Sequence, residues 1–287
     1  RDTDRSRGLG DVYKRQDLVR YADVSLQSEM ETVRAINKEC EKQGKRHKII
    51  LMMDLGDIRE GYLDEEELIA AAVETEKLSH VDLYGIGTNL TCFSFIQADE
   101  EKMECLAEMR RKVENAAGHT LEIVSGGNSA ALDLMMRGGI CEGVDNFRLG
   151  ESLLFGKERS RYTFLPGTRN DGFILECEVV EAKVKPSLPW GTAGVDSYGR
   201  KPVFTDRGEK RKKVICAIGR QDFDAETATP VDEGILILGA SSDHLMLDVT
   251  DSVKEYKVGD IVELRLGYFS VLRAFTSPYV EKIFLKK

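Results

Sequence analysis

The sequence lacks the closely spaced cysteines and histidines that build metal sites or disulfide frameworks. Its six cysteines are scattered without a C-x-x-C pair, and its four histidines form no H-x-x-x-H pair. We therefore expect no structural zinc site and no bound metal, because zinc ligands usually occur at short spacings. Scattered cysteines in a chain of 287 residues are typical of reduced thiols in a cytoplasmic protein.

Long apolar runs and an excess of positive charge are also missing. No stretch approaches the roughly 18 apolar residues that a membrane-spanning helix needs, and no signal peptide is visible. The formal net charge is −9, which argues against a nucleic-acid-binding surface. These features predict a soluble protein that acts on neither membranes nor nucleic acids.

Residues 1–16 differ in character from the rest of the chain. They are rich in arginine and aspartate, show no apolar periodicity and resemble a translated adapter sequence. We expect them to form a non-native or disordered leader outside the fold. From residue 17 onward, apolar and amphipathic segments alternate regularly.

This alternation predicts a parallel α/β domain over residues 17–160. Strands are expected at 22–26, 48–54, 81–90, 121–124 and 143–149, and helices at 29–42 (capped by Ser28), 65–78, 99–117 and 130–137. Five such units are typical of a parallel sheet or a TIM-type barrel. A closed (β/α)8 barrel needs eight units, so the sequence predicts a partial barrel of about five units and suggests an N-terminal truncation.

The pattern changes after residue 155 to short alternating segments. A linker is expected at residues 156–170, and an all-β domain at residues 170–287. Its strands are predicted at 173–185, 213–218, 234–238, 244–249 and 261–266. The predicted fold class is therefore α/β plus all-β, a partial barrel followed by a C-terminal β-domain.

Two motifs in the first domain indicate a binding site for a phosphate group. V-S-G-G-N-S at 124–129 and F-R-L-G-E-S at 147–152 each begin at the end of a predicted strand and run into a predicted helix. Glycines and hydroxyls at such junctions leave backbone N–H groups free for a dianionic phosphate, and Arg148 adds a fixed cation. This combination favours a phosphorylated cofactor whose ring also needs a donor; the alternative is two ordinary strand-to-helix turns. Further polar clusters, at 54–59 and 88–91, also follow predicted strands, where function concentrates in such folds.

Several segments together resemble a known family. They are M-D-L-G-D-I-R-E-G-Y (53–62), G-I-G-T-N-L-T-C (85–92), the two motifs above, K-P-S-L-P (185–189), L-G-A-S-S-D-H-L (238–245), K-V-G-D (257–260) and F-T-S-P-Y-V-E-K (275–282). In this order they are similar to the alanine-racemase-like, pyridoxal-phosphate-dependent enzymes, and most similar to the ornithine racemase branch. The resemblance covers nearly everything from residue 17 onward.

The resemblance implies a set of site residues. Arg148 matches the arginine at the pyridine nitrogen, Arg59 matches the arginine near the 3′ oxygen, and Asn89 stands where alanine racemases usually have histidine. Tyr279 matches a phosphate-contacting tyrosine, the alternative being a tyrosine in the core of the β-domain. The residues implied to bind the cofactor are Arg59, Asn89, Ser125, Gly126, Gly127, Asn128, Ser129, Arg148, Gly150, Glu151 and Tyr279, and those implied to bind substrate are Ser242 and Asp243.

Two expected catalytic groups have no match in the sequence. No lysine matches the family's Schiff-base lysine at the end of the first barrel strand, so we expect this chain alone to be inactive. The segment 218–222 also lacks the family's tyrosine base. Asp222 or His244 could act as the second base, the alternative for each being a structural role. Asp222 could instead bind the terminal ammonium of a diamino acid.

The function implied by the resemblance is racemisation of a small amino acid with pyridoxal 5′-phosphate as cofactor. Ornithine is the expected substrate, interconverted between its L and D forms by deprotonation and reprotonation at Cα. Two alternatives remain open: a non-catalytic pyridoxal-phosphate-binding protein, and a different barrel-type enzyme such as a decarboxylase or D-amino-acid lyase. The resemblance further implies a homodimer whose subunits share the active site.

Overall fold

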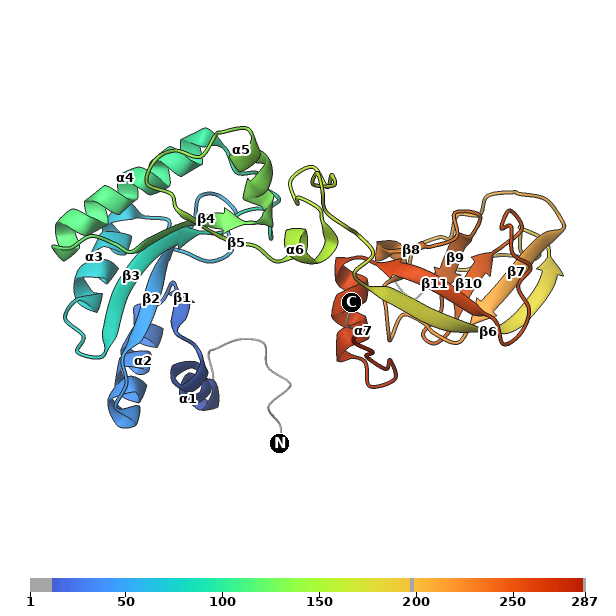
Figure 1. Cartoon of the computed structure of the whole chain (residues 1–287), viewed down its shortest axis with the longest axis horizontal. Helices are drawn as coiled ribbons and strands as arrows, with labels where there is room; N and C mark the ends of the chain where they lie inside the picture. Colours follow the sequence, from blue (N-terminus) through green and yellow to red (C-terminus); the bar gives the residue numbers. More distant parts are fainter. Residues whose placement is uncertain (1–11, 197–198, 286–287) are drawn as a thin grey trace. The chain divides into compact units, whose positions relative to one another are not determined.

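The structure is a computed structural model that describes residues 12–196 and 199–285. The chain divides into two compact units, Arg1–Thr168 and Arg169–Lys287. Figure 1 shows both units.

The first unit is built on one open parallel sheet. Its five strands follow chain order, and every adjacent pair is parallel. They are β1 (Val24–Gln27), β2 (His47–Met53), β3 (Val81–Thr88), β4 (Ile123–Asn128) and β5 (Asn146–Arg148). The partial parallel α/β barrel expected from the sequence is therefore confirmed. Because the strands are parallel, their carboxyl ends lie at one edge of the sheet, where the polar clusters also lie.

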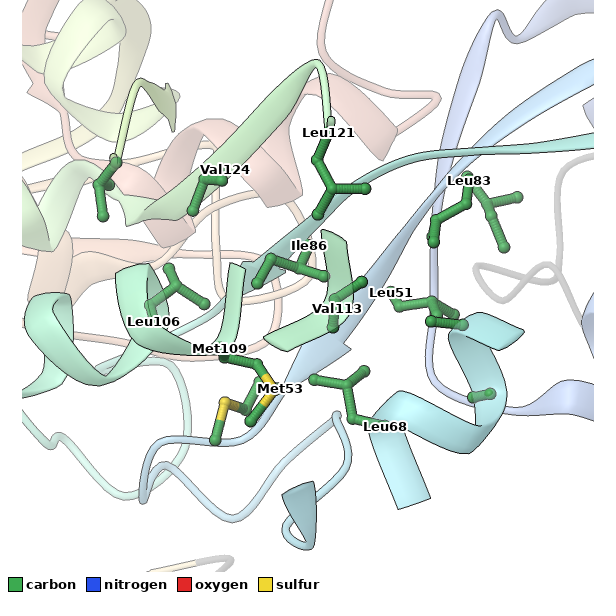
Figure 2. Close-up of a cluster of buried hydrophobic side chains, with 14 of the residues drawn as sticks. Leu51, Met53, Leu68, Leu83, Ile86, Leu106, Met109, Val113, Leu121 and Val124 are labelled. Carbon is green, nitrogen blue, oxygen red and sulfur yellow. The ribbon is translucent and has the colours of Figure 1, made fainter. Parts of the chain in front are cut away.

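Three long helices connect these strands and cover one face of the sheet (Figure 1). They are α2 (Met30–Gln43), α3 (Glu65–Thr75) and α4 (Glu100–Ala117). Figure 2 shows the core between them and the sheet, with Leu51 and Ile86 from strands facing Leu68 and Met109 from helices. All four side chains are fully buried. Burying a leucine of this size stabilises a fold by roughly 1.5–3 kcal/mol.

The boundaries of these helices follow from local capping. Asp64 accepts hydrogen bonds from the backbone N–H groups of the first turn of α3, and Asp99 does the same for α4. Gly44 ends α2 with φ = 61°, a left-handed conformation that costs glycine little. The cap expected at Ser28 is wrong: α2 begins at Met30, and its N-cap is Glu29, which makes no side-chain cap hydrogen bond.

Other boundaries also differ from the sequence-based expectation. Helix α1 (Val12–Tyr21) includes residues 12–16, which were expected outside the fold; its Leu18 and Val19 are buried in the core of the first unit. Residues 1–11, the rest of the expected leader, lie outside the described residues. Strand β4 runs through the glycines of the V-S-G-G-N-S motif instead of ending before them. The predicted helix 130–137 is a 3-10 turn, η1 (Ser129–Ala131), followed by α5 (Leu132–Met136), and α6 (Glu151–Phe155) follows β5.

The second unit is a six-stranded antiparallel sheet with strand order β8-β11-β6-β7-β10-β9. Its core is apolar and contains the fully buried Phe223. The all-β character expected from the sequence is confirmed, although β8, the turn η2 and helix α7 were not foreseen. The elements are β6 (Ile174–Lys185), β7 (Arg211–Cys216), η2 (Ala225–Thr227), β8 (Ala228–Pro230), β9 (Leu236–Ala240), β10 (Leu245–Asp248), β11 (Ile261–Leu266) and α7 (Tyr268–Thr276).

Within the described residues, no helix combines the length and apolar character needed to cross a bilayer.

Candidate cofactor site

A guanidinium lies at the carboxyl edge of the parallel sheet. Arg148, the last residue of β5, donates from Nη1 to Ser125 Oγ at 2.5 Å and from Nη2 to the carbonyl oxygen of Thr88 at 2.7 Å. Ser125 Oγ in turn donates to Asn146 Oδ1 at 2.8 Å. Residues of β3, β4 and β5 together therefore fix the guanidinium of Arg148. Burial lowers the pKa of Arg148, but a guanidinium keeps its protons under all ordinary conditions.

Backbone donors converge on the hydroxyl of Ser129, just after β4. The N–H groups of Gly150 and Ser152 donate to Ser129 Oγ at 3.3 and 3.2 Å, and the Ser152 hydroxyl lies 3.0 Å away. Ser129 and Ser152 are both 4% exposed. A Cβ added to Gly150 would meet no atom within 4 Å, so open space adjoins this set of donors. The structure thus brings together the two motifs that the sequence predicted as a phosphate cradle.

The two glycines of the V-S-G-G-N-S motif have different surroundings. A Cβ on Gly126 would lie 2.6 Å from Val144 Cγ1 and 2.9 Å from the Phe147 ring, so this glycine is required by packing. Gly127 has φ = 126°, a conformation that side chains rarely adopt. Both glycines are buried, and both shape the end of the strand.

Asn128 and Asn89 are in direct contact. Asn128 Nδ2 donates to Asn89 Oδ1 at 2.8 Å, and Asn89 is 7% exposed. The remaining amide group of Asn89, its Nδ2, is buried and has no hydrogen-bond partner among the described residues. Buried donors without partners are rare and call for an explanation.

Two buried carboxylates shape the loops at this edge. Asp54 accepts from the backbone N–H groups of Gly56, Ile58 and Arg59, and so folds the loop after β2. Asp57, 1% exposed, accepts from the backbone N–H groups of residues 92–94, in the loop after β3. Both carboxylates belong to the polar cluster at 54–59 expected from the sequence, but this role in folding the loops was not predicted. Their position directly after a continuous apolar strand was the signal that could have found them.

Backbone strain is concentrated in the same loops. Among described residues other than glycine, positive φ occurs at Ile58, Thr91, Phe95 and Tyr162, and the first three lie in the loops that the two carboxylates fold. Such conformations cost about 1–3 kcal/mol each and persist where surrounding contacts impose them.

Arg59 and Glu151, two other predicted cofactor residues, each form an ion pair with a different partner. Arg59 pairs with the neighbouring Glu60, and its side chain is 47% exposed. Glu151 lies 3.4 Å from Arg159, and its side chain is 12% exposed. Burial raises the pKa of Glu151, an effect that Arg159 opposes.

In the second unit, two of the segments predicted to carry catalysis lie side by side. The N–H groups of Arg220 and Gln221 donate to the carbonyls of Ser241 and Ser242 at 2.9 and 3.0 Å. Gly219 allows this approach, since a Cβ there would lie 2.3 Å from the backbone nitrogen of Asp243.

The predicted residues of these segments differ in exposure. Asp222 is 5% exposed and accepts from Ser277 Oγ at 2.7 Å, which is the environment of a structural carboxylate. His244 Nδ1 lies 3.1 Å from Asp243 Oδ1, and both side chains are about half exposed, as is consistent with contact to a ligand. Tyr279 is 79% exposed, so the alternative of a tyrosine in the core of this unit is wrong.

Comparison with known proteins identifies the family. Residues 11–158 match the model of the alanine racemase N-terminal domain, and the chain belongs to the alanine racemase family, a class of pyridoxal-phosphate-dependent amino-acid racemases. Over 267 residues it is 45% identical to the ornithine racemase of Acetoanaerobium sticklandii, covering 93% of this chain and 75% of the relative. Over 266 residues it is 40% identical to the lysine racemase of Thermotoga maritima, covering 93% and 73%.

Solved structures share the fold. The alanine racemase of Clostridium difficile 630 superposes with a TM-score of 0.62 at 19% identity, covering 94% of this chain and 71% of that chain. The alanine racemase of Bartonella henselae, solved with covalently bound pyridoxal phosphate, gives 0.57 at 19% identity, covering 88% and 67%. The resemblance, fold, enzyme class and cofactor expected from the sequence are thereby confirmed.

The residues of the first unit fit this cofactor. Arg148 offers a permanently protonated donor of the kind a ring nitrogen accepts from, and open space adjoins the N–H of Gly150. The unpaired Nδ2 of Asn89 offers one more donor at the same edge. Among the described residues, no group of three or more histidine, cysteine, aspartate or glutamate side chains is arranged to hold a metal ion.

Proposed function

We propose that this chain is the cofactor-binding and substrate-binding scaffold of an ornithine racemase. The 45% identity to an ornithine racemase over 93% of the chain supports ornithine, and the 40% identity to a lysine racemase keeps lysine as the nearest competitor. The observation that carries the proposal is the placement of Arg148, whose guanidinium is held by Ser125 Oγ and the Thr88 carbonyl at the edge where the cradle motifs meet.

Arg148 favours racemisation over side reactions. Pyridoxal phosphate, when bound, supplies an electron-withdrawing ring that stabilises negative charge at Cα of the substrate. Arg148 would offer a donor to the ring nitrogen of the bound cofactor and would keep its own proton, since a guanidinium releases none near neutral pH. A ring nitrogen held in this way would stay unprotonated, which would favour return of the proton to Cα over its transfer to a more distant atom.

The cradle holds the anionic end of the cofactor. The N–H groups of Gly150 and Ser152 both donate to the hydroxyl of Ser129, and the open space that adjoins Gly150 would receive the phosphate beside this cluster. Arg59, on the loop after β2, and Glu151, at the start of the short helix α6, are further cofactor contacts implied by the resemblance. Tyr279 remains a proposed phosphate contact, supported by its exposure within the second unit.

Racemisation in this family needs a Schiff-base lysine and a second base. No lysine of this sequence matches the motif of the family's Schiff-base lysine, so the 287-residue chain is expected to bind the cofactor without racemising. His244, paired with Asp243 and half exposed, is the better supported of the two candidates for the second base. Ser242 and Asp243 are proposed substrate contacts.

The proposed protein is a homodimer in the cytoplasm. A homodimer with a shared site is implied by the resemblance, and size-exclusion chromatography with light scattering tests it. The six cysteines are all free, which supports a reducing compartment such as the cytoplasm.

The experiment separates binding from turnover. Pyridoxal phosphate is titrated into the chain and its absorbance spectrum followed, with pyridoxal, which lacks the phosphate, as the matched control ligand. Saturable binding of the phosphate ester and much weaker binding of pyridoxal are expected. In a second arm, a lysine-bearing form, extended at its N-terminus by a barrel strand that ends in lysine, is incubated with L-ornithine, L-lysine and L-alanine, and the D-enantiomers are measured by chiral chromatography. Faster appearance of D-alanine than of D-ornithine contradicts the substrate assignment, and release of carbon dioxide favours a decarboxylase.

A further inference from the structure

The side chain of Asn128 connects the ends of two strands. Its Nδ2 donates to Asn89 Oδ1 at 2.8 Å and to the carbonyl of Leu90 at 2.9 Å, and lies 3.4 Å from Cys92 Sγ. Its Oδ1 accepts from the N–H of Ala130 at 2.8 Å. Both ends of this amide are therefore occupied by groups of the protein itself.

These contacts allow only one orientation of the Asn128 amide. A backbone carbonyl can only accept a hydrogen bond, and a backbone N–H can only donate one. The carbonyl of Leu90 therefore requires Nδ2 on its side, and the N–H of Ala130 requires Oδ1 on the other. Asn128 consequently presents an N–H donor to the side chain of Asn89.

The orientation of Asn89 follows from that of Asn128. Facing a donor, Asn89 must present its Oδ1, so its Nδ2 is turned away from Asn128. This Nδ2 is buried without a partner among the described residues, and the side chain is 7% exposed. Asn89 directly follows Thr88, whose carbonyl holds the guanidinium of Arg148 at 2.7 Å. The free donor thus belongs to the strand end that also fixes the proposed ring contact.

We propose that Asn128 is a positioning residue that fixes Asn89 as a hydrogen-bond donor to an acceptor atom of bound pyridoxal phosphate. This inference rests on the proposed function and refines it, because Asn128 then acts through Asn89 instead of binding the cofactor itself. The occupied amide of Asn128 has no donor left to offer, whereas the amide of Asn89 does.

A double-mutant cycle tests the proposal. Asn128→Asp replaces the donor by an acceptor, so Asn89 can hydrogen-bond to it only by turning its own Nδ2 inward. We expect pyridoxal phosphate to bind about tenfold more weakly to Asn128→Asp and to Asn89→Ala, the loss that one hydrogen bond of typical strength accounts for. The double variant should bind no more weakly than Asn89→Ala alone.

Two control variants and two further measurements keep the result interpretable. Asn128→Ala, carried through the same cycle, removes the donor without adding charge. Asn37→Asp, on α2 and bonded to the His80 N–H, adds the same charge away from the strand ends and should leave binding unchanged. Thermal unfolding of each variant without cofactor reports damage to the fold, and the absorbance spectrum of the bound cofactor reports its environment independently of turnover.

The outcomes are distinct. Equal losses from Asn128→Asp in the wild-type and Asn89→Ala backgrounds overturn the inference, because Asn128 then acts without Asn89. Unchanged affinity in Asn128→Asp also overturns it. If the wild-type chain itself fails to bind pyridoxal phosphate, the proposed function fails first and this inference falls with it.

Discussion

Ser277 donates a hydrogen bond of 2.7 Å to the buried carboxylate of Asp222, 55 residues earlier in the chain. The same Ser277 oxygen accepts from the N–H of Tyr279 at 3.1 Å. Asp222 therefore anchors, through one hydroxyl, the segment that carries the tyrosine proposed to contact phosphate. A carboxylate that two sequence-based hypotheses assigned to catalysis or substrate binding is here part of a structural link.

Replacing Asp222 tests this link. Asp222→Ala leaves the Ser277 hydroxyl without its acceptor in a buried environment, and we expect a loss of about 1–3 kcal/mol in the free energy of unfolding. Asp222→Asn keeps an acceptor oxygen and should lose less. Urea unfolding monitored by circular dichroism measures both. If Asp222→Ala leaves stability unchanged but abolishes racemisation in the lysine-bearing form, Asp222 acts in catalysis and the structural role is contradicted.

Arg148 is expected to tolerate no conservative replacement. A lysine at this position cannot donate to Ser125 Oγ and the Thr88 carbonyl in the planar geometry of a guanidinium. Arg148→Lys should therefore weaken pyridoxal-phosphate binding by about tenfold or more, as measured by absorbance titration. Arg137→Lys, at an exposed ion pair with Asp133, is the matched control and should bind normally. Normal affinity in Arg148→Lys contradicts the proposed ring contact.

Two histidines should affect stability with opposite pH dependence. His47 is 2% exposed and bonded to Ser25 Oγ at 2.9 Å, and its burial lowers its pKa. Its unfolded form takes up a proton below a pH of about 6.5 while the folded form resists, so stability falls as the pH decreases through that range. His47→Gln should flatten the fall in urea midpoint between pH 7.5 and 5.

His119 is the control for this effect. Its pKa is raised by the backbone of Thr120 and by Glu76, so its stabilising contribution is complete below a pH of about 6.5 and is lost as the pH rises. His119→Gln should therefore lower stability at pH 5 more than at pH 7.5. The same pH response from both variants is incompatible with these opposite shifts.

Replacing Gly126 and Gly150 by alanine should distinguish an effect on core packing from an effect on cofactor binding. Gly126→Ala places a Cβ 2.6 Å from Val144 Cγ1, and overpacking of this kind costs about 1–3 kcal/mol. Gly150→Ala meets nothing within 4 Å and should leave unfolding nearly unchanged while filling space beside the donors for phosphate. Calorimetric titration of pyridoxal phosphate should show weaker binding to Gly150→Ala. Strong destabilisation by Gly150→Ala argues against open space there.

Local pattern accounted for much of the fold. The continuous apolar run of β2 and the amphipathic pattern of α4 predicted both elements to within about one residue, because side-chain burial imposes these periods directly. The path of β4 through Gly126 and Gly127 was missed, since glycines normally end strands unless neighbouring strands hold them. α1 was missed because its first half was taken as part of the leader, and because its Leu18 and Val19 have meaning only once they pack against the core.

By itself the sequence determined the alternation of strands and helices, the two cradle motifs and the position of Arg148 at a strand end. It could not determine which polar side chains meet. The contact between Asn128 and Asn89 spans 39 residues, and the contact between Asp57 and the N–H of Ser94 spans 37. Such contacts arise only when parallel strands align in register and bring their loops together, so hydrogen-bond orientation at this site was decided by the tertiary structure.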